Sequence, residues 1–268
     1  MDFKKRFELV KRNTEEILGE EDLEKLLKER NITPEFCGAL RVTDEASISS
    51  VTQAVGEVKI QIEALLSMGL PNSPMADSAI KVSSGNYVTG RPYGVLNGVD
   101  LNLTGRVRSI EKETINTRLQ AGEIVLITPL GYSATGEVFN LSSIEVASQV
   151  AIELSADKLI MFNHSKTLKD ESGDIVRQLT CDEARVRLGA GNTKSSDDTP
   201  ASALEHGIKA CESGVGRIHY VDSRIDGGLL QELFTRDGNG TLLTKTPYDK
   251  IRPATVQDVN GIYELIRP

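Results

Sequence analysis

The pattern of polar and apolar positions in segment 217–243 predicts a strand, a helix and a second strand. The alternating run 218–221 is typical of a strand. The helix that follows has an apolar face made of Leu229, Leu230, Leu233 and Phe234. Glycine and asparagine at 238–240 are expected to end this helix, because they tolerate the left-handed backbone of a helix C-terminus. Residues 241–243 predict another strand, and this order is the repeating unit of a parallel α/β sheet.

Similar patterns upstream predict more strands and helices. A helix begins at Thr43 or Asp44 and carries apolar residues at helical spacing, namely Ile48, Val51, Val55, Val58 and Ile62. The apolar run 124–127 is typical of a strand buried in a parallel sheet. We expect residues 129–132 to form a loop at the carboxyl end of that strand, where open α/β sheets bind ligands.

The middle of the chain continues this alternation. A helix capped by Asn140 or Ser142 precedes a strand at 158–162, which predicts another β–α–β unit. A hairpin turn is predicted at 170–174, and 189–201 is a polar, glycine-rich stretch that is expected to be mobile. A helix at 203–213 then leads into segment 217–243.

Candidate chemistry centres on one carboxylate, Glu232, which lies on a predicted helix beside a loop that contains Gly238 and Gly240. A carboxylate can accept two parallel, charge-assisted hydrogen bonds from a guanidinium. A Gly-x-Gly backbone can approach a ligand closely. These residues therefore suit a small amino acid with a cationic side chain. The alternative is that Glu232 is a solvated helix residue and that the glycines only cap the helix.

Composition and charge exclude several functions. The 268 residues carry a net charge of −8, which argues against nucleic-acid binding, and the absence of Trp argues against a platform for stacked bases. Three widely spaced cysteines and the lack of a signal peptide predict a cytoplasmic protein with reduced thiols. No apolar stretch has the length of a membrane-spanning helix. The three histidines (His164, His206 and His219) lack metal-ligand spacing, so no metal site is predicted.

Residues 1–36 differ from the rest of the chain. They are densely charged with both signs, and their apolar residues fall at helical spacing, which predicts two short helices broken near Gly19. The run LVKRNTEEILGEEDLEKLL resembles the N-terminal helices of archaeal-type tyrosyl-tRNA synthetases. The catalytic signatures of that family are absent, so a synthetase function is rejected. We interpret 1–36 as a helical leader unrelated to the rest, with oligomerisation as the alternative role.

Residues 37–250 resemble the amino-acid-kinase-like domain of bacterial N-acetylglutamate synthases. The runs that carry the resemblance are LRVTD, VSSGNYVTGRPYGVLNGVDLNLTGRVRSI, GEVFNLSSIEVASQVAIEL and DGGLLQELFTRDGNGT. Residues 251–268 resemble the opening strand and helix of the GNAT acetyltransferase domain that is fused to it. The resemblance implies a three-layer αβα fold with an open, mainly parallel sheet of amino-acid-kinase type. It also implies that the sheet is incomplete at its N-terminal part, because the family's first strand and glycine-rich loop are not matched.

The resemblance also implies a function. The family transfers an acetyl group from acetyl-CoA to L-glutamate in arginine biosynthesis, and its kinase-like domain binds L-arginine as an inhibitor. Carried over, Glu232 would bind the guanidinium, while Gly238 and Gly240 would line the pocket. The acetyl-CoA-binding loop of the family is not matched, so we expect no catalytic residues, no cofactor and no acetyl transfer by this chain alone. A homo-oligomer is expected.

Two other functions are weighed. One is a phosphotransferase of the N-acetylglutamate kinase type. The kinases carry an Asn-Ala-Asp pattern where this chain reads Asn140-Leu141-Ser142-Ser143, and this departure argues against phosphoryl transfer. The other is a structural module in which residues 1–31 interlock subunits.

Overall fold

The computed structural model describes residues 36–37, 40–67, 80–163, 168, 172, 174–189, 200–235 and 238–246. The leader predicted at 1–36 lies outside these residues except for its last one, and residues 251–268 lie outside them entirely. The turn at 170–174 and the polar stretch at 189–201 lie largely outside them as well.

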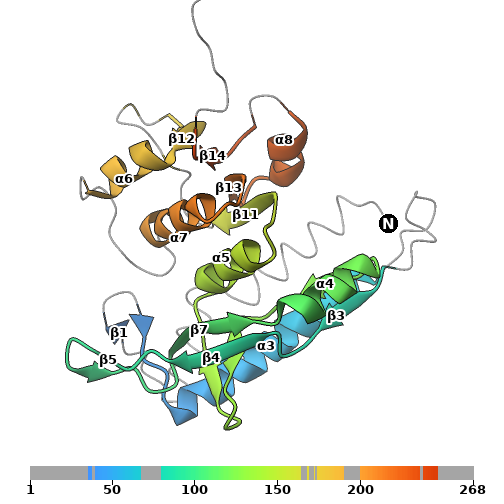
Figure 1. The fold of residues 1–268 in the computed structure, drawn as a ribbon, viewed down its shortest axis with the longest axis vertical. Helices are drawn as coiled ribbons and strands as arrows, with labels where there is room; N and C mark the ends of the chain where they lie inside the picture. Colours follow the sequence, from blue (N-terminus) through green and yellow to red (C-terminus); the bar gives the residue numbers. More distant parts are fainter. Residues whose placement is uncertain are drawn as a thin grey trace, which may run out of the picture.

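The first half of the described chain is rich in short strands, and two helices interrupt them. The elements are β1 (Phe36–Cys37), β2 (Leu40–Arg41), α3 (Glu45–Leu66), β3 (Val82–Ser84), β4 (Val88–Pro92), β5 (Val95–Leu96), β6 (Val99–Asp100), β7 (Gly105–Ile110), α4 (Lys112–Gln120), β8 (Ile124–Leu126), β9 (Leu130–Tyr132) and β10 (Val138–Asn140). A four-stranded sheet in the order β10-β9-β4-β7 forms the centre of this half, while β3 and β8 pair in parallel. Figure 1 shows α3 and α4 running beside these strands.

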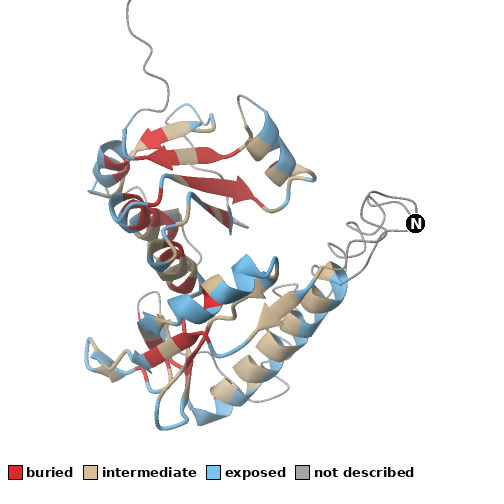
Figure 2. Cartoon of the chain, turned by 45° about the vertical axis from the view of Figure 1, so that its right-hand side comes forward, coloured by how far each residue is buried: buried red, intermediate tan, exposed pale blue. Residues whose placement is uncertain are grey.

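The second half contains a second four-stranded sheet and most of the helices. Its elements are α5 (Ser143–Glu153), β11 (Lys158–Asn163), β12 (Gln178–Thr180), α6 (Cys181–Gly189), α7 (Pro200–Glu212), β13 (Arg217–Asp222), α8 (Gly228–Phe234) and β14 (Thr241–Thr244). The sheet order is β11-β13-β14-β12, with β11 parallel to β13 and β12 parallel to β14. The main core lies here, and β13 and β14 contribute Ile218, Tyr220 and Leu243 to it. Figure 2 shows this concentration of buried residues.

Helix starts follow the capping residues that the sequence offers. The Asp44 carboxylate accepts a hydrogen bond from the Ser47 N–H at 2.7 Å, and the Ser142 hydroxyl accepts one from the Glu145 N–H at 3.5 Å. Asp44 and Ser142 are therefore the N-caps, rather than Thr43 and Asn140. Within α3, however, the only buried residue is Ser47, so the predicted apolar positions of this helix are not part of the core.

Three predictions about local structure were wrong. Strands β13 and β14 are antiparallel, not parallel, because the seven-residue α8 is too short for a crossover and the chain turns back beside β13. Residues 129–132, predicted as a ligand loop, contain strand β9, which pairs with β10. On α8, Leu230 and Phe234 of the predicted apolar face are 56% and 80% exposed, because this short helix lies at the surface.

The alternation of strands and helices confirms the predicted α/β fold. The strand pairings among the described residues are mixed, since the β13–β14 and β4–β7 ladders are antiparallel. Among these residues no helix has both the length and the apolar character that crossing a membrane requires. The same part of the chain contains no group of three or more potential metal-ligating side chains.

Candidate effector-binding site

The Glu232 side chain is buried and fully engaged with its own surroundings. Its Oε2 atom accepts hydrogen bonds from the backbone N–H of Asn239 at 3.0 Å and of Gly240 at 2.8 Å. Its Oε1 atom lies 2.7 Å from Nδ1 of His219, and 6% of the Glu232 side chain is exposed. We call His219, Glu232, Asn239 and Gly240 the Glu232 cluster. The interpretation of Glu232 as a solvated helix residue is therefore wrong.

The two glycines are required by the close approach of the loop to the carboxylate. Gly238 has a φ of 55°, and a Cβ atom there would overlap Oε2 of Glu232. A Cβ atom on Gly240 would overlap the backbone oxygen of Tyr220 in β13. The structure thus brings together all three residues that the sequence selected. Neither glycine caps α8 directly, because that helix ends at Phe234, with Thr235 as its C-cap.

Side chains on both sides hold this loop in place. The Asn239 amide donates to Oε1 of Gln231 at 3.0 Å, and the Gly238 N–H donates to the Thr235 hydroxyl at 3.2 Å. From the neighbouring sheet edge, the guanidinium of Arg177 donates to the Gly238 carbonyl at 2.5 Å. The loop is therefore anchored to α8 and to the chain beside β12 as well as to Glu232.

Hydrogen bonds, rather than solvent, set the charge state of Glu232. Burial raises the pKa of this carboxyl, but the hydrogen bonds from His219, Gly240 and Asn239 outweigh it, so the net pKa is lowered. The group is a carboxylate at neutral pH and accepts hydrogen bonds only, so Nδ1 of His219 carries the proton that faces it. The charge of Glu232 is thus stabilised inside the fold.

His219 is the residue of this cluster that sequence reasoning missed. It lies on the buried strand β13, thirteen residues before Glu232, and its only sequence signal was a histidine within an alternating strand. Around the cluster, three buried polar atoms have no hydrogen-bond partner among the described residues: Nε2 of His219, Oδ1 of Asn239 and Oγ1 of Thr241. Buried polar atoms without partners are uncommon in proteins, and these three can each still take a hydrogen-bond partner.

The acceptor capacity of Glu232 limits what the site can bind in this arrangement. A carboxylate has about four lone-pair directions, and His219, Asn239 and Gly240 use three of them. Both directions of Oε2 are used and one remains on Oε1, so a guanidinium that donates one N–H to each oxygen requires a backbone N–H to leave Oε2. Arginine binding by Glu232, Gly238 and Gly240 stays a prediction.

Asn140, the residue weighed for phosphoryl transfer, has a structural contact. Its amide donates to the Thr43 hydroxyl at 3.1 Å, next to the Asp44 cap of α3. The Thr43 hydroxyl also accepts a hydrogen bond from Thr104 at 2.8 Å. Asn140, on β10 of the four-stranded sheet β10-β9-β4-β7, therefore links that sheet to the residues at the start of α3.

Sequence comparison identifies long, closely related proteins. The chain is 45% identical over 246 residues to the amino-acid acetyltransferase of Ectopseudomonas mendocina. This alignment covers 92% of this chain and 56% of the relative. The amino-acid acetyltransferase of Pseudomonas fluorescens strain SBW25 is also 45% identical, over 249 residues. This chain thus spans 56% of the length of these curated relatives.

Structure comparison agrees with this result. The crystal structure of N-acetylglutamate synthase from Neisseria gonorrhoeae, complexed with coenzyme A and L-arginine, superposes with a TM-score of 0.79 at 34% identity. That superposition covers 92% of this chain and 57% of the gonococcal chain. Carbamate kinase from Giardia shares the fold, with a TM-score of 0.52 at 11% identity. The sequence profile of the amino acid kinase family matches residues 18–218. The chain belongs to the amino acid kinase family.

Proposed function

We propose that this chain is the arginine-sensing, amino-acid-kinase-like part of an N-acetylglutamate synthase. L-Arginine would bind at Glu232, Gly238 and Gly240. The observation that carries the proposal is the buried Glu232 carboxylate, which is surrounded by buried polar atoms without partners among the described residues. The similar gonococcal protein is an N-acetylglutamate synthase that was crystallised with L-arginine, which supports the same ligand here.

The chemistry of the cluster favours a guanidinium over an ammonium. Glu232 offers a planar carboxylate, and a guanidinium matches that plane with paired N–H donors. An ammonium is a compact point charge and cannot match the plane of the carboxylate with paired N–H donors, so its binding is expected to be weaker. The guanidinium would displace His219 from Oε1 and one of the two backbone N–H groups from Oε2, so that it donates to both oxygens. The unpartnered Oδ1 of Asn239 would accept a further hydrogen bond from the ligand.

Arginine should stabilise the folded protein, and lysine should not. At ten times its dissociation constant, a ligand adds about 1.4 kcal/mol to the free energy of unfolding. For a chain of this size that corresponds to a rise in Tm of roughly 3–6 °C, measured by a thermal shift assay. Glu232→Gln should lose the response, whereas Glu153→Gln on the exposed end of α5 should keep it. An equal response to lysine, or a full arginine response in Glu232→Gln, would contradict the proposed site.

The proposed function does not include catalysis by this chain alone. With acetyl-CoA and L-glutamate, we expect no release of coenzyme A thiol above the blank, because no residue here is assigned to bind acetyl-CoA. A thiol-reactive dye measures this release directly, and a full-length relative serves as the positive control. Steady release by this chain would show that it carries an acetyltransferase site. The homo-oligomer, the cytoplasmic location and the boundaries at residues 36 and 250 also stay proposals.

A further inference from the structure

Three asparagines of this chain are directly followed by glycine, the sequence in which asparagine loses its side-chain amide most readily. They are Asn97, Asn239 and Asn260, of which Asn260 lies outside the described residues. In this deamidation the backbone nitrogen of the following residue attacks the side-chain amide carbon of the asparagine. Glycine favours the attack because it has no side chain to hinder its nitrogen. The two described sites therefore differ only in how the fold holds the reacting groups.

Asn97 lies at the exposed tip of a small hairpin. Strands β5 and β6 form a two-stranded sheet of their own with two residue pairs, and Asn97 and Gly98 are the turn between them. Their φ angles of 51° and 82° are those expected of a two-residue hairpin turn with this sequence. Both residues are exposed, and Figure 1 shows the β5 hairpin projecting from the rest of the first half.

The reacting groups of this turn are not engaged elsewhere. Within the described part of the chain, neither the Gly98 N–H nor the Asn97 side chain has a hydrogen-bond partner. A Cβ atom on Gly98 would meet nothing within 4 Å, so the space around its nitrogen is open. A ladder of two residue pairs is also a small barrier to local opening. The turn can therefore rearrange until the Gly98 nitrogen reaches the Asn97 amide carbon.

Asn239 has the same neighbour in sequence, but both of its reacting groups are held. The Gly240 N–H donates to Oε2 of Glu232 at 2.8 Å, and the Asn239 side-chain amide donates to Oε1 of Gln231 at 3.0 Å. The Asn239 N–H donates to the same Oε2 atom at 3.0 Å, and Gly240 is buried. Attack would require the Gly240 nitrogen to leave Glu232 and the Asn239 amide to leave Gln231.

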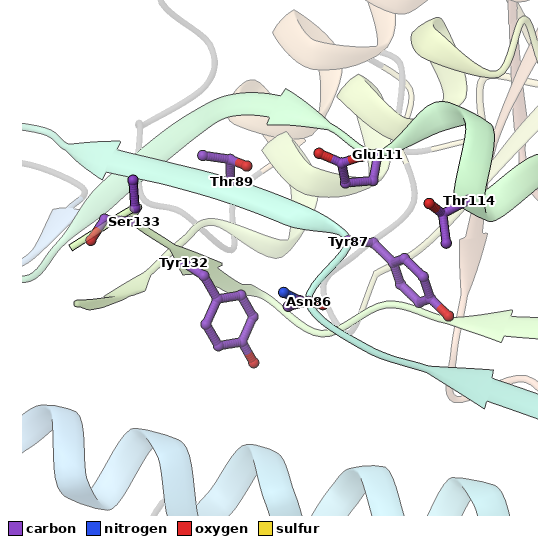
Figure 3. Close-up of a pocket in the computed structure, with 8 residues that line it drawn as sticks. Asn86, Tyr87, Thr89, Glu111, Thr114, Tyr132 and Ser133 are labelled. Carbon is purple, nitrogen blue, oxygen red and sulfur yellow. The ribbon is translucent and has the colours of Figure 1, made fainter. Parts of the chain in front are cut away.

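Asn86 shows that exposure alone does not make an asparagine reactive. It is exposed and lines the pocket drawn in Figure 3, where it lies beside Tyr87. Tyr87 is also the next residue in the chain, and it is buried. Its side chain hinders the only backbone nitrogen that could attack Asn86. Exposure and a following glycine coincide at Asn97.

We propose that Asn97 is a site of spontaneous deamidation, and that Glu232 and Gln231 protect Asn239 from the same reaction. A base from the solvent takes the proton of the Gly98 nitrogen, which bonds to Cγ of Asn97 while the bond from Cγ to the side-chain nitrogen breaks and ammonia leaves. Water then adds to one of the two carbonyl carbons of the five-membered imide and opens the ring. The product is aspartate or isoaspartate, according to which carbon–nitrogen bond is cleaved.

The product alters the hairpin as well as its charge. Deamidation consumes water, releases ammonia and adds a carboxylate to the turn, and isoaspartate also lengthens the main chain there by one carbon atom. Leu96 and Val99, which flank the turn, pack against a buried cluster that contains Leu101. We expect the isoaspartate form to lose part of this packing. The proposal rests on contacts of Glu232 and does not require arginine to bind there.

Mass spectrometry of the full chain after incubation at mildly alkaline pH and a non-denaturing temperature tests the proposal. Trypsin does not cleave before proline, so one peptide, 82–106, contains Asn86, Asn97 and Asn102. Fragment masses show where an amide has become a carboxyl group. We expect conversion at Asn97, none at Asn86 or Asn102, and conversion at Asn239 that is slower than at Asn97 by at least about tenfold.

A synthetic peptide with the sequence of residues 94–100 gives the rate without the fold, and a short, mildly acidic digestion prevents conversion during sample preparation. Asn97 that stays intact in the protein after this peptide has fully converted would overturn the first part of the proposal. Equal rates at Asn97 and Asn239 in the wild type would overturn the second part.

Variants identify what protects Asn239. Gln231→Ala, at an exposed position, should raise its rate of conversion about fivefold, the equivalent of one hydrogen bond. Glu232→Ala, shown by circular dichroism to be folded, should raise it further, whereas Leu230→Ala on the exposed face of the same helix should not change it. The rate at Asn97 should be the same in all three. An unchanged rate at Asn239 in Gln231→Ala would refute the protection, whether or not Glu232→Ala folds.

Discussion

Replacing Glu232 with alanine will destabilise the protein by about 3–5 kcal/mol, the cost of removing one partner from a buried polar cluster. The substitution leaves the backbone N–H groups of Asn239 and Gly240 and the ring of His219 without their acceptor. Each buried group without a partner retains its desolvation penalty. Urea unfolding followed by circular dichroism measures the loss, and Glu153→Ala on the exposed end of α5 serves as the matched control.

A milder substitution separates charge from shape at the same position. Glu232→Gln keeps a carbonyl oxygen for the two backbone N–H groups but removes the charge, so we expect it to cost about 1–2 kcal/mol at neutral pH. A loss below about 1 kcal/mol in the alanine variant would show that the cluster contributes little to stability. The arginine response of Glu232→Gln can still be measured, because this variant is expected to remain folded.

The same cluster predicts the direction of a pH dependence. Folding lowers the pKa of Glu232, so the unfolded chain binds a proton more tightly than the folded chain does. The stabilisation is complete above the unfolded pKa of about 4.3 and is lost as the pH falls through the lower, folded value. In the acid range, wild-type stability should therefore fall more steeply with decreasing pH than that of Glu232→Gln. If the stability of the wild type and of Glu232→Gln falls equally with decreasing pH, folding does not lower the pKa of Glu232.

Local sequence signals were sufficient to predict part of this fold. The alternating pattern before Asp222 predicted β13, and Asp44 was one of two residues predicted to cap α3. Glu232 and the glycines at 238 and 240 were selected together because they are near one another in sequence, and the structure brings them into contact. Elements and clusters that depend on neighbours in sequence were therefore predictable.

Contacts between distant segments were not predictable in the same way. An alternating strand pattern carries no information about strand direction, so the antiparallel pairing of β13 with β14 was missed. Gly131 was interpreted as part of a loop, but it lies in β9 because that strand packs closely on β4. A Cβ atom on Gly131 would lie 2.7 Å from the Cα of Gly90. The contact of His219 with Glu232 likewise depends on how α8 packs against β13.

Gly207→Ala will also destabilise the protein, by about 3 kcal/mol, because α7 packs directly on β13 at this residue. A Cβ atom on Gly207 would overlap the Tyr220 hydroxyl and lie 3.3 Å from Cδ2 of Leu243. That hydroxyl is buried and donates to the Ala203 carbonyl at 3.1 Å. Burial raises the pKa of Tyr220, so the hydroxyl stays protonated and needs this acceptor. The extra methyl group therefore forces either the ring or the helix to move.

The second substitution that tests this contact is Tyr220→Phe, which removes the overlapping oxygen. Alone it should cost about 1 kcal/mol, the value of one buried hydrogen bond. Combined with Gly207→Ala it should restore about 1 kcal/mol, because the helix no longer has to avoid the hydroxyl. Restoration should be incomplete, since the Cβ atom would still lie 3.0 Å from the ring carbon Cζ.

Urea unfolding gives the stability of the wild type, the two single variants and the double variant. These four values form a double-mutant cycle, which gives the interaction energy between Gly207→Ala and Tyr220→Phe. The control is Gly56→Ala in α3, where a Cβ atom would meet nothing within 4 Å. There alanine should stabilise the helix by up to about 1 kcal/mol, because glycine is the poorer helix former. Opposite signs at the two helical glycines would show that packing, not helix propensity, selects glycine at 207. Additive effects of Gly207→Ala and Tyr220→Phe would show instead that the helix adjusts without moving Tyr220.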